Sequence, residues 1–401
     1  MADDKKFAQT ERFSGEVNKC IDCGNCTFWC PVYEVRPRES SVARGKNTLI
    51  RALLKGEIEI NEELVDALNT CTLCMACTEH CLVDCDVKSA VIAARSDKAG
   101  AQGLDRKLVS SSGYYRTGRF LAAQKDSPPG EALEERFLRQ SVPLVNSPPE
   151  GVETRMRVGF FVGCTTNFLF PELGKKIIRF LTRNGVEVIV PREQGCCGSP
   201  ALLRVGDFDT ARERADTSVR LFKDLDYVVT GCPTCASTAK KYAEFLADTP
   251  RRKKDYTQFG DKVTEIVGFL ADTLGLADLD YHAGAEIKGK RVTWHDPCHL
   301  SRYLGIREQP RQILRNMEGL EYVEMPRADW CCGMAGVFSE SYYQLSTKIA
   351  DKKAEAVEAV GADIIATSCP GCMLQLTDAV VRHGMQKKVM HIIELLEPGS
   401  S

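Results

Sequence analysis

The sequence predicts a multidomain protein in which an all-helical, cysteine-rich module precedes two duplicated α/β domains, each built on a parallel sheet. Two short cysteine runs with the same spacing lie between residues 20 and 81. A longer cysteine pattern then occurs twice, at an almost constant offset, in the remainder of the chain. In both copies short β-rich runs alternate with helical stretches, and this alternation is typical of a parallel sheet with helices on both faces.

Composition limits the function classes. The 401 residues are 43% hydrophobic and 27% charged, which suits a soluble protein of two or three domains. A net charge of −2 gives no general affinity for nucleic acid. The polar start, residues 1–6, lacks the features of a signal peptide, and no apolar run is long enough to cross a bilayer. We therefore expect a cytoplasmic chain whose thiols stay reduced and free to bind metal.

The two short runs have the spacing of bacterial ferredoxins. Each reads Cys-x2-Cys-x2-Cys-x3-Cys, on Cys20, Cys23, Cys26 and Cys30, and again on Cys71, Cys74, Cys77 and Cys81. Three cysteines at this spacing wrap one cubane 4Fe–4S cluster, while the fourth completes the cluster of the other run. We therefore predict one cubane on Cys20, Cys23, Cys26 and Cys81, and another on Cys71, Cys74, Cys77 and Cys30.

Other interpretations of these cysteines fit less well. Zinc sites use two pairs of thiolates rather than two quartets of this spacing. Disulfides are disfavoured because Cys-x2-Cys and adjacent Cys-Cys pairs have poor geometry, and nothing indicates secretion. One cysteine stays outside the motifs: Leu82 occupies the usual place of a second proline, and Cys85 follows soon after. Cys85 is either an alternative to Cys81 as a ligand or a spare buried thiol.

Helical patterns at residues 41–55 and 61–68 separate the two runs. This arrangement resembles the all-helical ferredoxin module of the iron–sulfur subunits of respiratory dehydrogenases, and we assign it to residues 1–100. Residues 101–156 contain no cysteine and include two Ser-Pro-Pro breakers. They are predicted to form a linker with one short helix at 132–140.

The rest of the chain is predicted to be a duplication. The cysteines are Cys164, Cys196, Cys197, Cys232 and Cys235 in the first copy, and Cys298, Cys331, Cys332, Cys369 and Cys372 in the second. Matching cysteines of the three segments are 134, 135 and 137 residues apart. A nearly constant offset indicates two copies of one domain, which we place at residues 157–280 and 281–401.

In each copy, three predicted strands lead into the cysteine segments. In the first copy the strands span residues 157–162, 186–190 and 227–230, with helices at 173–183, 208–224 and 238–247. In the second copy they span residues 291–295, 322–325 and 363–367, with helices at 311–317, 341–360 and 374–381. Functional groups of parallel sheets gather beyond the carboxyl ends of the strands, which is where these thiols are expected. Gly198 and Gly333 allow a tight bend beside the paired sulfurs.

The repeated cysteine pattern points to a known family. In the first copy it reads Cys-x31-Cys-Cys-Gly-x33-Cys-Pro-x-Cys, which resembles the cysteine-rich CCG domain of heterodisulfide reductase. The segments 295–299, 330–336 and 368–372 of the second copy are typical of it. The order of a ferredoxin module and two CCG domains resembles the D subunit of heterodisulfide reductase. It is also similar to the iron–sulfur subunits of glycolate oxidase, of anaerobic glycerol-3-phosphate dehydrogenase (its C subunit) and of lactate utilisation systems.

The resemblance implies a set of ligands, because each complete CCG motif of heterodisulfide reductases holds a noncubane 4Fe–4S cluster through five cysteines. One such cluster is expected on Cys164, Cys196, Cys197, Cys232 and Cys235, and the other on Cys298, Cys331, Cys332, Cys369 and Cys372. His295 and His299 flank Cys298. Each is a candidate iron ligand, hydrogen-bond donor to a cluster sulfur or proton donor, while the simpler alternative is a loop histidine fixed by hydrogen bonds.

The resemblance also implies a function, that of an iron–sulfur subunit in a multi-subunit anaerobic oxidoreductase of the heterodisulfide reductase D type. Two cubane clusters would pass electrons to or from two noncubane clusters that act on a disulfide or thiol substrate. The alternative is a non-catalytic carrier between a flavin dehydrogenase for a 2-hydroxyacid or glycerol-3-phosphate and the membrane quinone pool. A structural scaffold with degenerate sites is disfavoured because both cysteine quintets are intact.

The expected partners follow from what the sequence lacks. No Gly-x-Gly-x-x-Gly run follows a predicted strand, so we expect no flavin or nicotinamide site in this chain. Electrons should come from a flavin-containing dehydrogenase or another redox subunit. A membrane haem b or quinone-reactive subunit would hold the chain on the inner face of the membrane. No nucleic-acid partner is expected.

Overall fold

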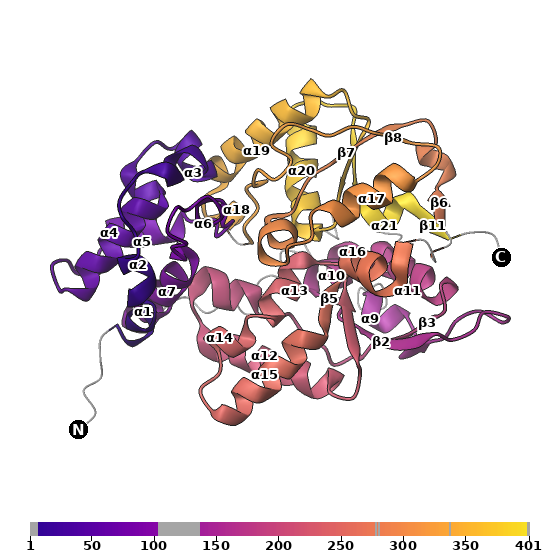
Figure 1. Cartoon of the computed structure of the whole chain (residues 1–401), viewed down its shortest axis with the longest axis horizontal. Coiled ribbons are helices and arrows are strands. Elements are labelled where there is room, and N and C mark those ends of the chain that lie inside the picture. The colour runs from indigo at the N-terminus through magenta and orange to yellow at the C-terminus, as the bar shows by residue number, and fades with distance from the viewer. Residues whose placement is uncertain (1–6, 103–136, 277–278, 280, 337, 399–401) are drawn as a thin grey trace, which may run out of the picture.

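A helical N-terminal module lies beside two α/β units in the computed structural model of the chain (Figure 1). The structure describes residues 7–102, 137–276, 279, 281–336 and 338–398. Most of the predicted linker and of its predicted helix therefore lies outside the described residues. The N-terminal module, in indigo in Figure 1, packs on the first α/β unit through α7 (Val87–Gln102) and η4 (Pro200–Val205). It packs on the second through α3 (Pro31–Val35) and α19 (Tyr343–Ala359).

The N-terminal module consists of short helices, and residues 7–102 contain no strand. The helices are α1 (Ala8–Arg12), α2 (Ser14–Asn18), η1 (Asn25–Phe28), α3 (Pro31–Val35), η2 (Glu39–Ser41), α4 (Ala43–Leu54), α5 (Glu62–Asn69), α6 (Ala76–Glu79) and α7 (Val87–Gln102). The two predicted helices correspond to α4 and α5, and Asn61 caps α5 by accepting the N–H of Leu64 at 2.9 Å. The cysteine runs occupy the loops and first turns around η1, α3 and α6.

The apolar faces of these helices share a core with the first α/β unit. Ile50 of α4, Leu68 of α5 and Val91 of α7 belong to the same buried cluster as Leu202 and Phe208 of that unit. Burial of aliphatic and aromatic side chains is the main favourable term in such packing. The module is therefore held against the α/β part by a continuous hydrophobic interface.

The first α/β unit has a five-stranded sheet in the order β1-β3-β2-β4-β5. Its strands are β1 (Val145–Asn146), β2 (Met156–Phe160), β3 (Val186–Ile189), β4 (Tyr227–Thr230) and β5 (Val263–Glu265). The last four are parallel, with Val158 of β2 paired to Val188 of β3. β1 runs antiparallel to β3. Residues 145–146 of the predicted linker thus belong to the sheet.

The helices of the first unit connect these strands. They are α9 (Leu138–Ser141), α10 (Cys164–Leu169), α11 (Pro171–Arg183), η4 (Pro200–Val205), α12 (Phe208–Phe222), α13 (Pro233–Ala239), α14 (Tyr242–Phe245), α15 (Pro250–Lys262), α16 (Ile266–Gly268) and η5 (Phe269–Gly275). The single helix predicted at 238–247 is divided between α13 and α14. The break buries Tyr242, whose hydroxyl donates to the carbonyl of Cys197 at 2.7 Å.

The second unit repeats the topology of the first. Its parallel sheet has the order β10-β9-β7-β8, from β7 (Arg291–Trp294), β8 (Glu321–Tyr322), β9 (Ile364–Thr367) and β10 (Lys388–His391). Read as β8-β7-β9-β10, this matches β3-β2-β4-β5, as expected for two copies of one domain. A separate antiparallel pair joins β6 (Tyr281–Ala283) to β11 (Leu396–Pro398).

The helices of the second unit complete the structure. They are η7 (Ala285–Ile287), η8 (His299–Tyr303), α17 (Glu308–Asn316), α18 (Phe338–Ser341), α19 (Tyr343–Ala359), α20 (Pro370–Arg382) and α21 (Ile392–Leu395). Phe160 and Val188 of the first sheet lie in the same buried cluster as Trp294 and Ile364 of the second. The two α/β units are therefore packed as a pair, while the exact domain boundaries stay predictions.

Candidate metal centres

Cys30 of the first run lies among the cysteines of the second run. One small cavity is lined by Cys30, Cys71, Cys74 and Cys77 together with residues of α3 and α7. Pro31 begins α3 directly after Cys30 and turns the chain away from this cavity. The four sulfurs are the set that the spacing assigns to one cubane cluster. That assignment stays a prediction, and the geometry is compatible with it.

The other four cysteines of the N-terminal module lie nearer the surface. Cys23 is exposed, and Cys20, Cys26 and Cys81 are half-buried. Two contacts tie their loops together: the Trp29 ring stacks on His80 at 3.5 Å, and Asn25 donates to the His80 carbonyl at 2.5 Å. Cys81 is therefore held close to the loop that carries the first run.

Cys85 is buried and has its own hydrogen-bond partners. Its Sγ accepts from Asn47 Nδ2 at 3.2 Å and donates to the Glu16 carbonyl at 3.1 Å. Its backbone N–H donates to Cys81 Sγ at 3.4 Å. Burial raises the pKa of Cys85 to about 12, so it is a thiol at neutral pH. These contacts fit a structural cysteine, because its thiol is held by Asn47 and Glu16 and its backbone N–H donates to the candidate ligand Cys81.

The ten cysteines of the duplicated units sit at the carboxyl ends of strands. Cys164 follows β2 and begins α10, Cys196 and Cys197 follow β3, and Cys232 follows β4 directly before α13. The second unit repeats this placement with Cys298 after β7, Cys331 and Cys332 after β8, and Cys369 before α20. A helix N-terminus carries a partial positive charge, which stabilises a thiolate placed there.

All ten of these cysteines line one cavity between the two units. The volume open to water-sized molecules in it is about 120 Å³, and Cys71 of the N-terminal module also lines it. The apolar part of the wall comes from residues such as Leu203, Pro297 and Met334. Clefts at the carboxyl ends of parallel strands are the usual ligand sites of such sheets. The duplication therefore forms one shared cavity rather than two separate sites, and we call this cavity the CCG chamber.

The thiols form an unbroken line of side-chain contacts. It runs through Cys164, Cys196, Cys197, Cys235, Cys232, Cys369, Cys372, Cys332, Cys331 and Cys298. The two quintets meet where Cys232 contacts Cys369. At the other end Cys331 contacts Cys74, which belongs to the N-terminal module.

Hydrogen bonds among these thiols favour deprotonation at three positions. Cys197 and Cys369 each contact two neighbouring thiols, and Cys332 contacts Cys331 and, at 3.4 Å between the sulfurs, Cys372. These bonds lower the pKa of Cys197 to about 6 and the pKa values of the other two well below the ordinary range of a thiol. Closely spaced thiolates are the soft donors that iron–sulfur clusters require. The donor set thus fits the expected cofactor.

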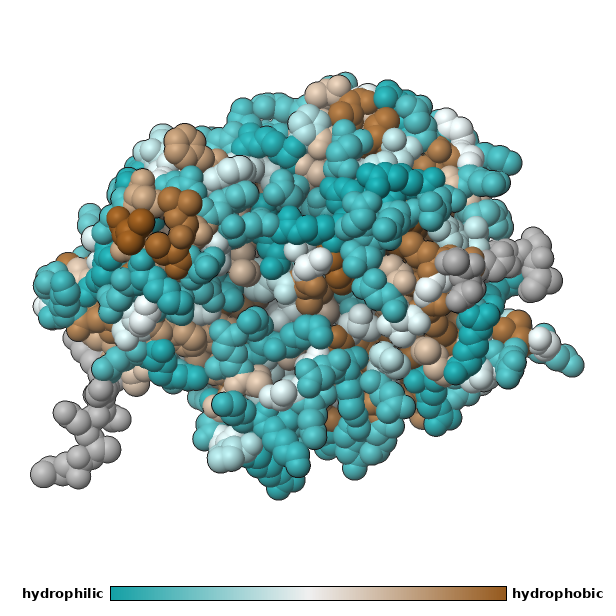
Figure 2. Space-filling view, in the orientation of Figure 1, coloured by the Kyte–Doolittle hydropathy of each residue, from teal (hydrophilic) through white to brown (hydrophobic). Residues whose placement is uncertain are grey.

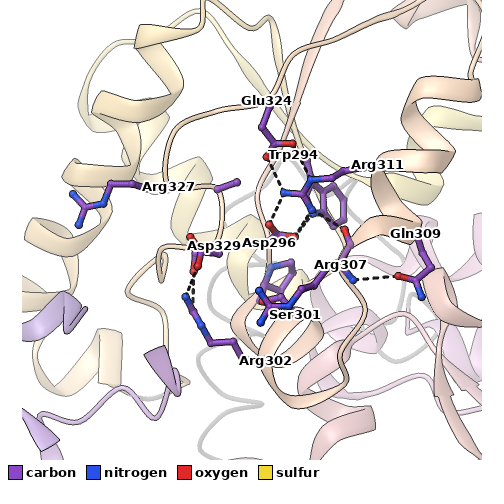
Figure 3. A network of polar contacts seen from close by, with 12 residues as sticks. Trp294, Asp296, Ser301, Arg302, Arg307, Gln309, Arg311, Glu324, Arg327 and Asp329 are labelled. Carbon is purple, nitrogen blue, oxygen red and sulfur yellow. Dashed lines mark hydrogen bonds and ion pairs between the residues drawn. The ribbon is translucent and has the colours of Figure 1, made fainter. Parts of the chain in front are cut away.

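Arg311 holds the loop that carries the first cysteine of the second quintet (Figure 3). Its guanidinium donates to both oxygens of Asp296, at 3.1 and 2.7 Å, and also pairs with Glu324. Trp294 Nε1 donates to the same carboxylate at 2.7 Å. Because Asp296 lies two residues before Cys298, these bonds fix the position of that cysteine.

Arg302 holds the next loop and reaches the N-terminal module. Its side chain is nearly fully buried and donates to Asp329 at 2.6 Å (Figure 3). It also donates to Glu79 of α6 at 2.6 Å. Asp329 lies two residues before Cys331. This ion-pair cluster therefore fixes the adjacent cysteines and links them to the loop of Cys74 and Cys77.

His295 is the more unusual of the two candidate histidines. It is fully buried, and neither ring nitrogen has a hydrogen-bond partner. One of these nitrogens lies within 4.8 Å of the sulfurs of Cys332 and Cys372. Burial lowers the pKa of His295 to about 3, so the imidazole is neutral. A buried unpartnered ring beside thiols is what a cofactor bound there would satisfy.

His299 lines the shared cavity. Its Nδ1 lies 2.6 Å from Ser237 Oγ, and its ring stacks on Tyr303 at 4.2 Å. Burial lowers its pKa to about 4. The histidine is therefore fixed and neutral, and its role in proton transfer stays a prediction.

Comparisons with known proteins bear on this site. The cysteine-rich CCG domain profile matches residues 158–240 and 292–377, and a 4Fe-4S dicluster domain profile matches residues 16–85. The chain is 31% identical to the B subunit of fumarate reductase (CoM/CoB) from Methanothermobacter marburgensis, over 98% of this chain and 73% of that one. This chain belongs to the CCG family of iron–sulfur proteins. Its N-terminal module is a 4Fe–4S ferredoxin-like domain, and both α/β units are CCG domains.

Other CCG proteins are similar over different lengths. The probable glycolate oxidase iron-sulfur subunit of Bacillus subtilis is 28% identical over 95% of this chain and 94% of that one. Lactate utilization protein A of Geobacillus kaustophilus is 35% identical over 60% of this chain and 98% of that one. The last relative matches over a length close to that of two CCG domains. Within the described residues, every helix is too short or too polar to span a bilayer.

The sequence analysis did not identify three buried charged residues, two that line the chamber and one close to Cys369. Arg95 and Arg204 line the cavity, and Glu265 is fully buried at the end of β5. Arg95 follows the apolar run at residues 90–94, and a charge at the edge of such a run is a weak sign of a buried cation. Nothing in the local sequence marks the other two.

Proposed function

We propose that this chain is the iron–sulfur subunit of a multi-subunit oxidoreductase, and that its two CCG domains form one site for a disulfide or a pair of thiols. The reaction breaks one S–S bond, takes up two electrons and two protons, and forms two S–H bonds, or runs in reverse. When bound, the clusters supply one-electron steps, so that a two-electron couple is completed in two stages.

The observation that carries this proposal is the shared chamber. All ten CCG cysteines line one cavity, and the quintets meet at Cys232 and Cys369. A disulfide has two sulfurs that separate during reduction, and a chamber with a thiolate set on each side can receive one sulfur from each half. A pure carrier needs no such chamber, because electron transfer only requires cofactors close to one another.

Contacts between the domains support an order of electron flow. Cys74 of the predicted second cubane contacts Cys331, and Cys331 contacts Cys298. The second CCG quintet is therefore the neighbour of the N-terminal module in this line, and the first quintet lies beyond it. In our proposal the second CCG site exchanges electrons with the cubanes. The first CCG site receives one of the two substrate sulfurs, and the second site receives the other.

The chamber also contains a candidate hydrogen-bond donor for a thiolate product. His299 lines the cavity, and its Nδ1 is 2.6 Å from the hydroxyl of Ser237. In our proposal the single Ser237 hydroxyl proton points to Nδ1 rather than to the Thr234 carbonyl 3.2 Å away, which leaves the Nε2–H free to donate to a thiolate product. We propose that the neutral His299 stabilises a thiolate product through this hydrogen bond and that Ser237 fixes the ring tautomer.

Electrons enter or leave through the N-terminal face in this proposal. Figure 2 shows a hydrophobic patch over the N-terminal module. Among the large apolar side chains of the N-terminal module, Phe28 is 78% exposed, Leu82 71% and Ile21 60%, and each lies within two residues of a predicted ligand of the first cubane. An exposed apolar patch around a redox site suits a protein partner. We assign this face to the subunit that exchanges electrons with the chain.

The second candidate is a carrier between a flavin dehydrogenase and the quinone pool. One observation favours it: the similarity to the glycolate oxidase iron-sulfur subunit covers 95% of this chain and 94% of that one. Under this alternative the CCG clusters would be relay points and the chamber would bind no sulfur substrate.

The test uses the native complex, purified anaerobically with its partner subunits. Adding small dithiols or disulfides to the oxidised complex is expected to produce a new paramagnetic signal. The Cys332→Ser variant should lose this signal and keep the N-terminal clusters. No signal with any thiol or disulfide, together with reduction by a co-purified flavin dehydrogenase, would contradict the proposal and support the carrier.

A further inference from the structure

Three cations gather at one end of the CCG chamber. Arg95 and Lys98 lie on the same face of α7, and Arg204 lies in η4. Arg95 is 1% exposed and Arg204 is 9% exposed, and both line the cavity that holds the ten cysteines. Lys98 does not line the cavity, but burial and the two nearby guanidinium groups lower its pKa.

These cations have no carboxylate partner among the described residues. Arg95 donates to the backbone carbonyls of Leu203, Leu68 and Cys71, and its Nε has no partner. Arg204 donates to the Asn69 carbonyl and lies over the rings of Phe338 and Tyr342, at 5.2 and 5.5 Å. Carbonyl groups and aromatic rings orient a guanidinium but do not neutralise its charge.

Other arginines beside predicted ligands are neutralised, which makes a useful contrast. Arg302, next to Cys74 and Cys298, pairs with Glu79 and Asp329. The more exposed arginines follow the same pattern, as Arg44–Glu39 and Arg51–Asp22. Closeness to cysteines therefore does not by itself explain why Arg95 and Arg204 lack carboxylates.

Unpaired buried charges are costly, and like charges placed together add repulsion. Burial and the neighbouring Arg95 lower the pKa of Arg204 to about 9. An anion entering the chamber would relieve this cost, and the free Arg95 Nε together with the fork of Arg204 offers the donors that a carboxylate accepts. The cations thus act as a preformed anion receptor at the wall of a redox chamber.

We propose that Arg95 and Arg204, with Lys98 adding positive charge close to them, form the anion-binding end of the chamber, and that the sulfur substrate carries a carboxylate bound there. This inference rests on the proposed thiol or disulfide chemistry. It narrows the substrate to a small carboxylate-bearing sulfur compound whose reacting sulfur lies at the cysteines while its carboxylate contacts Arg204 and Arg95.

The test measures binding, not turnover, on the full chain with its clusters anaerobically assembled. The probe is thiodiglycolate, a thioether dicarboxylate that cannot be reduced, and the comparison is its neutral diamide. Calorimetry is expected to show binding of the dicarboxylate at least about tenfold tighter than that of the diamide. Arg204→Gln should lose about tenfold for the dicarboxylate only, Arg204→Lys should lose less, and the exposed control Arg157→Gln should lose nothing.

Three outcomes would overturn the proposal. They are equal binding of dicarboxylate and diamide, an Arg204→Gln variant with full iron content and unchanged affinity, and inorganic sulfate binding as tightly as the dicarboxylate. The last result would indicate a free-anion site with no role for a substrate carboxylate. Failure of the proposed reaction would give a different result from failure of the anion site. Thiodiglycolate would still bind through Arg204, but dithiodiglycolate, the matching disulfide, would not be reduced.

Discussion

Single residues distinguish the two CCG copies from each other. With the offset of 134 that relates Cys164 to Cys298, His295 corresponds to Phe161 and His299 to Thr165. The second site therefore carries two imidazoles where the first carries a phenyl ring and a hydroxyl. Since the second quintet is also the one that contacts Cys74, the two sites are expected to differ in redox potential.

Replacing His295 by phenylalanine tests whether this residue causes the expected difference in redox potential between the two CCG sites. A neutral imidazole that donates to a cluster sulfur raises the potential, so His295→Phe is expected to lower the midpoint potential of one cluster by on the order of tens of millivolts. The ring in the first copy, Phe161, shows that this position of the domain accepts a phenyl group. A redox titration followed by electron paramagnetic resonance measures the shift.

The same titration contains its control, because the other three clusters should keep their potentials. Unchanged potentials with full iron content would mean that His295 only fills space in the core.

Glu265 provides a second test at the residue scale. It is fully buried, its Oε2 accepts from the Val267 N–H at 2.7 Å, and its Oε1 has no partner. Burial raises its pKa from 4.5 to about 8, so the folded protein holds a proton that the unfolded chain loses above pH 4.5. The folded state therefore binds more protons than the unfolded state across this window. The free energy of unfolding falls as pH rises from 4.5 to about 8.

Glu265→Gln is expected to remove this dependence. The amide keeps an acceptor for Val267 and cannot ionise, so the variant should gain stability relative to the parent as pH rises from about 6 to about 8, at up to about 1.4 kcal/mol per pH unit. Denaturant unfolding under anaerobic conditions at several pH values measures the difference. Parallel stability curves for parent and variant would show that the carboxyl is already ionised in the folded protein.

At the scale of elements, the turn after each cysteine pair requires glycine, and the second turn requires it for one additional reason. Gly333 has φ +90°, and a Cβ there would lie 2.6 Å from the Ser346 carbonyl oxygen of α19. Gly198 has φ +81°, and a Cβ would lie 3.3 Å from Ala211 Cα of α12. Positive φ strains any other residue in both turns, while the backbone clash occurs only in the second.

Gly333→Ala is therefore expected to be more damaging than Gly198→Ala. The shared strain costs on the order of 1–3 kcal/mol, and the clash adds to it in the second domain. Thermal unfolding and iron content, measured on both variants side by side, check the order. Equal losses, or a larger loss for Gly198→Ala, would contradict the geometry.

The elements also show where sequence patterns are informative. The strands of both domains could be predicted because each β-rich run ends at a cysteine segment, and the observed β2, β4, β7 and β9 lie within or beside the predicted ranges. The division of 238–247 into two helices could not, because it depends on the contact between the Tyr242 hydroxyl and the Cys197 carbonyl. Pairing of β1 with β3 was missed because a two-residue strand leaves no periodic signal.

At the scale of the whole molecule, three units meet around one chamber. Spacing and the repeat offset separated the cysteines into two runs of four and two sets of five, while the five-cysteine ligand sets came from the family resemblance. Spacing could not predict that both quintets line one cavity, or that Arg95 and Arg204 close its end, because these features arise from packing between units. Contacts such as that between Cys74 and Cys331 depend on the assembled fold.

The partner face is tested at the same scale. The double variant Phe28→Glu, Leu82→Glu is expected to slow electron exchange with the partner subunit at least about tenfold, because charges replace apolar contacts at the docking face. Val381→Glu is the matched control, since Val381 is 72% exposed on α20 of the second CCG domain. Reduction by dithionite, which needs no docking, should be equal in all three proteins. A normal rate with the partner for the double variant would place the docking site elsewhere.

The central claim is that the CCG quintets hold clusters in addition to those of the N-terminal module. Counting iron and acid-labile sulfide in the anaerobically purified chain tests it most directly. Four 4Fe–4S clusters predict about sixteen irons per chain, and a Cys197→Ser, Cys332→Ser double variant should fall towards about eight. About eight irons in the parent chain, unchanged in the double variant, would show that the CCG cysteines bind no cluster and would contradict the account.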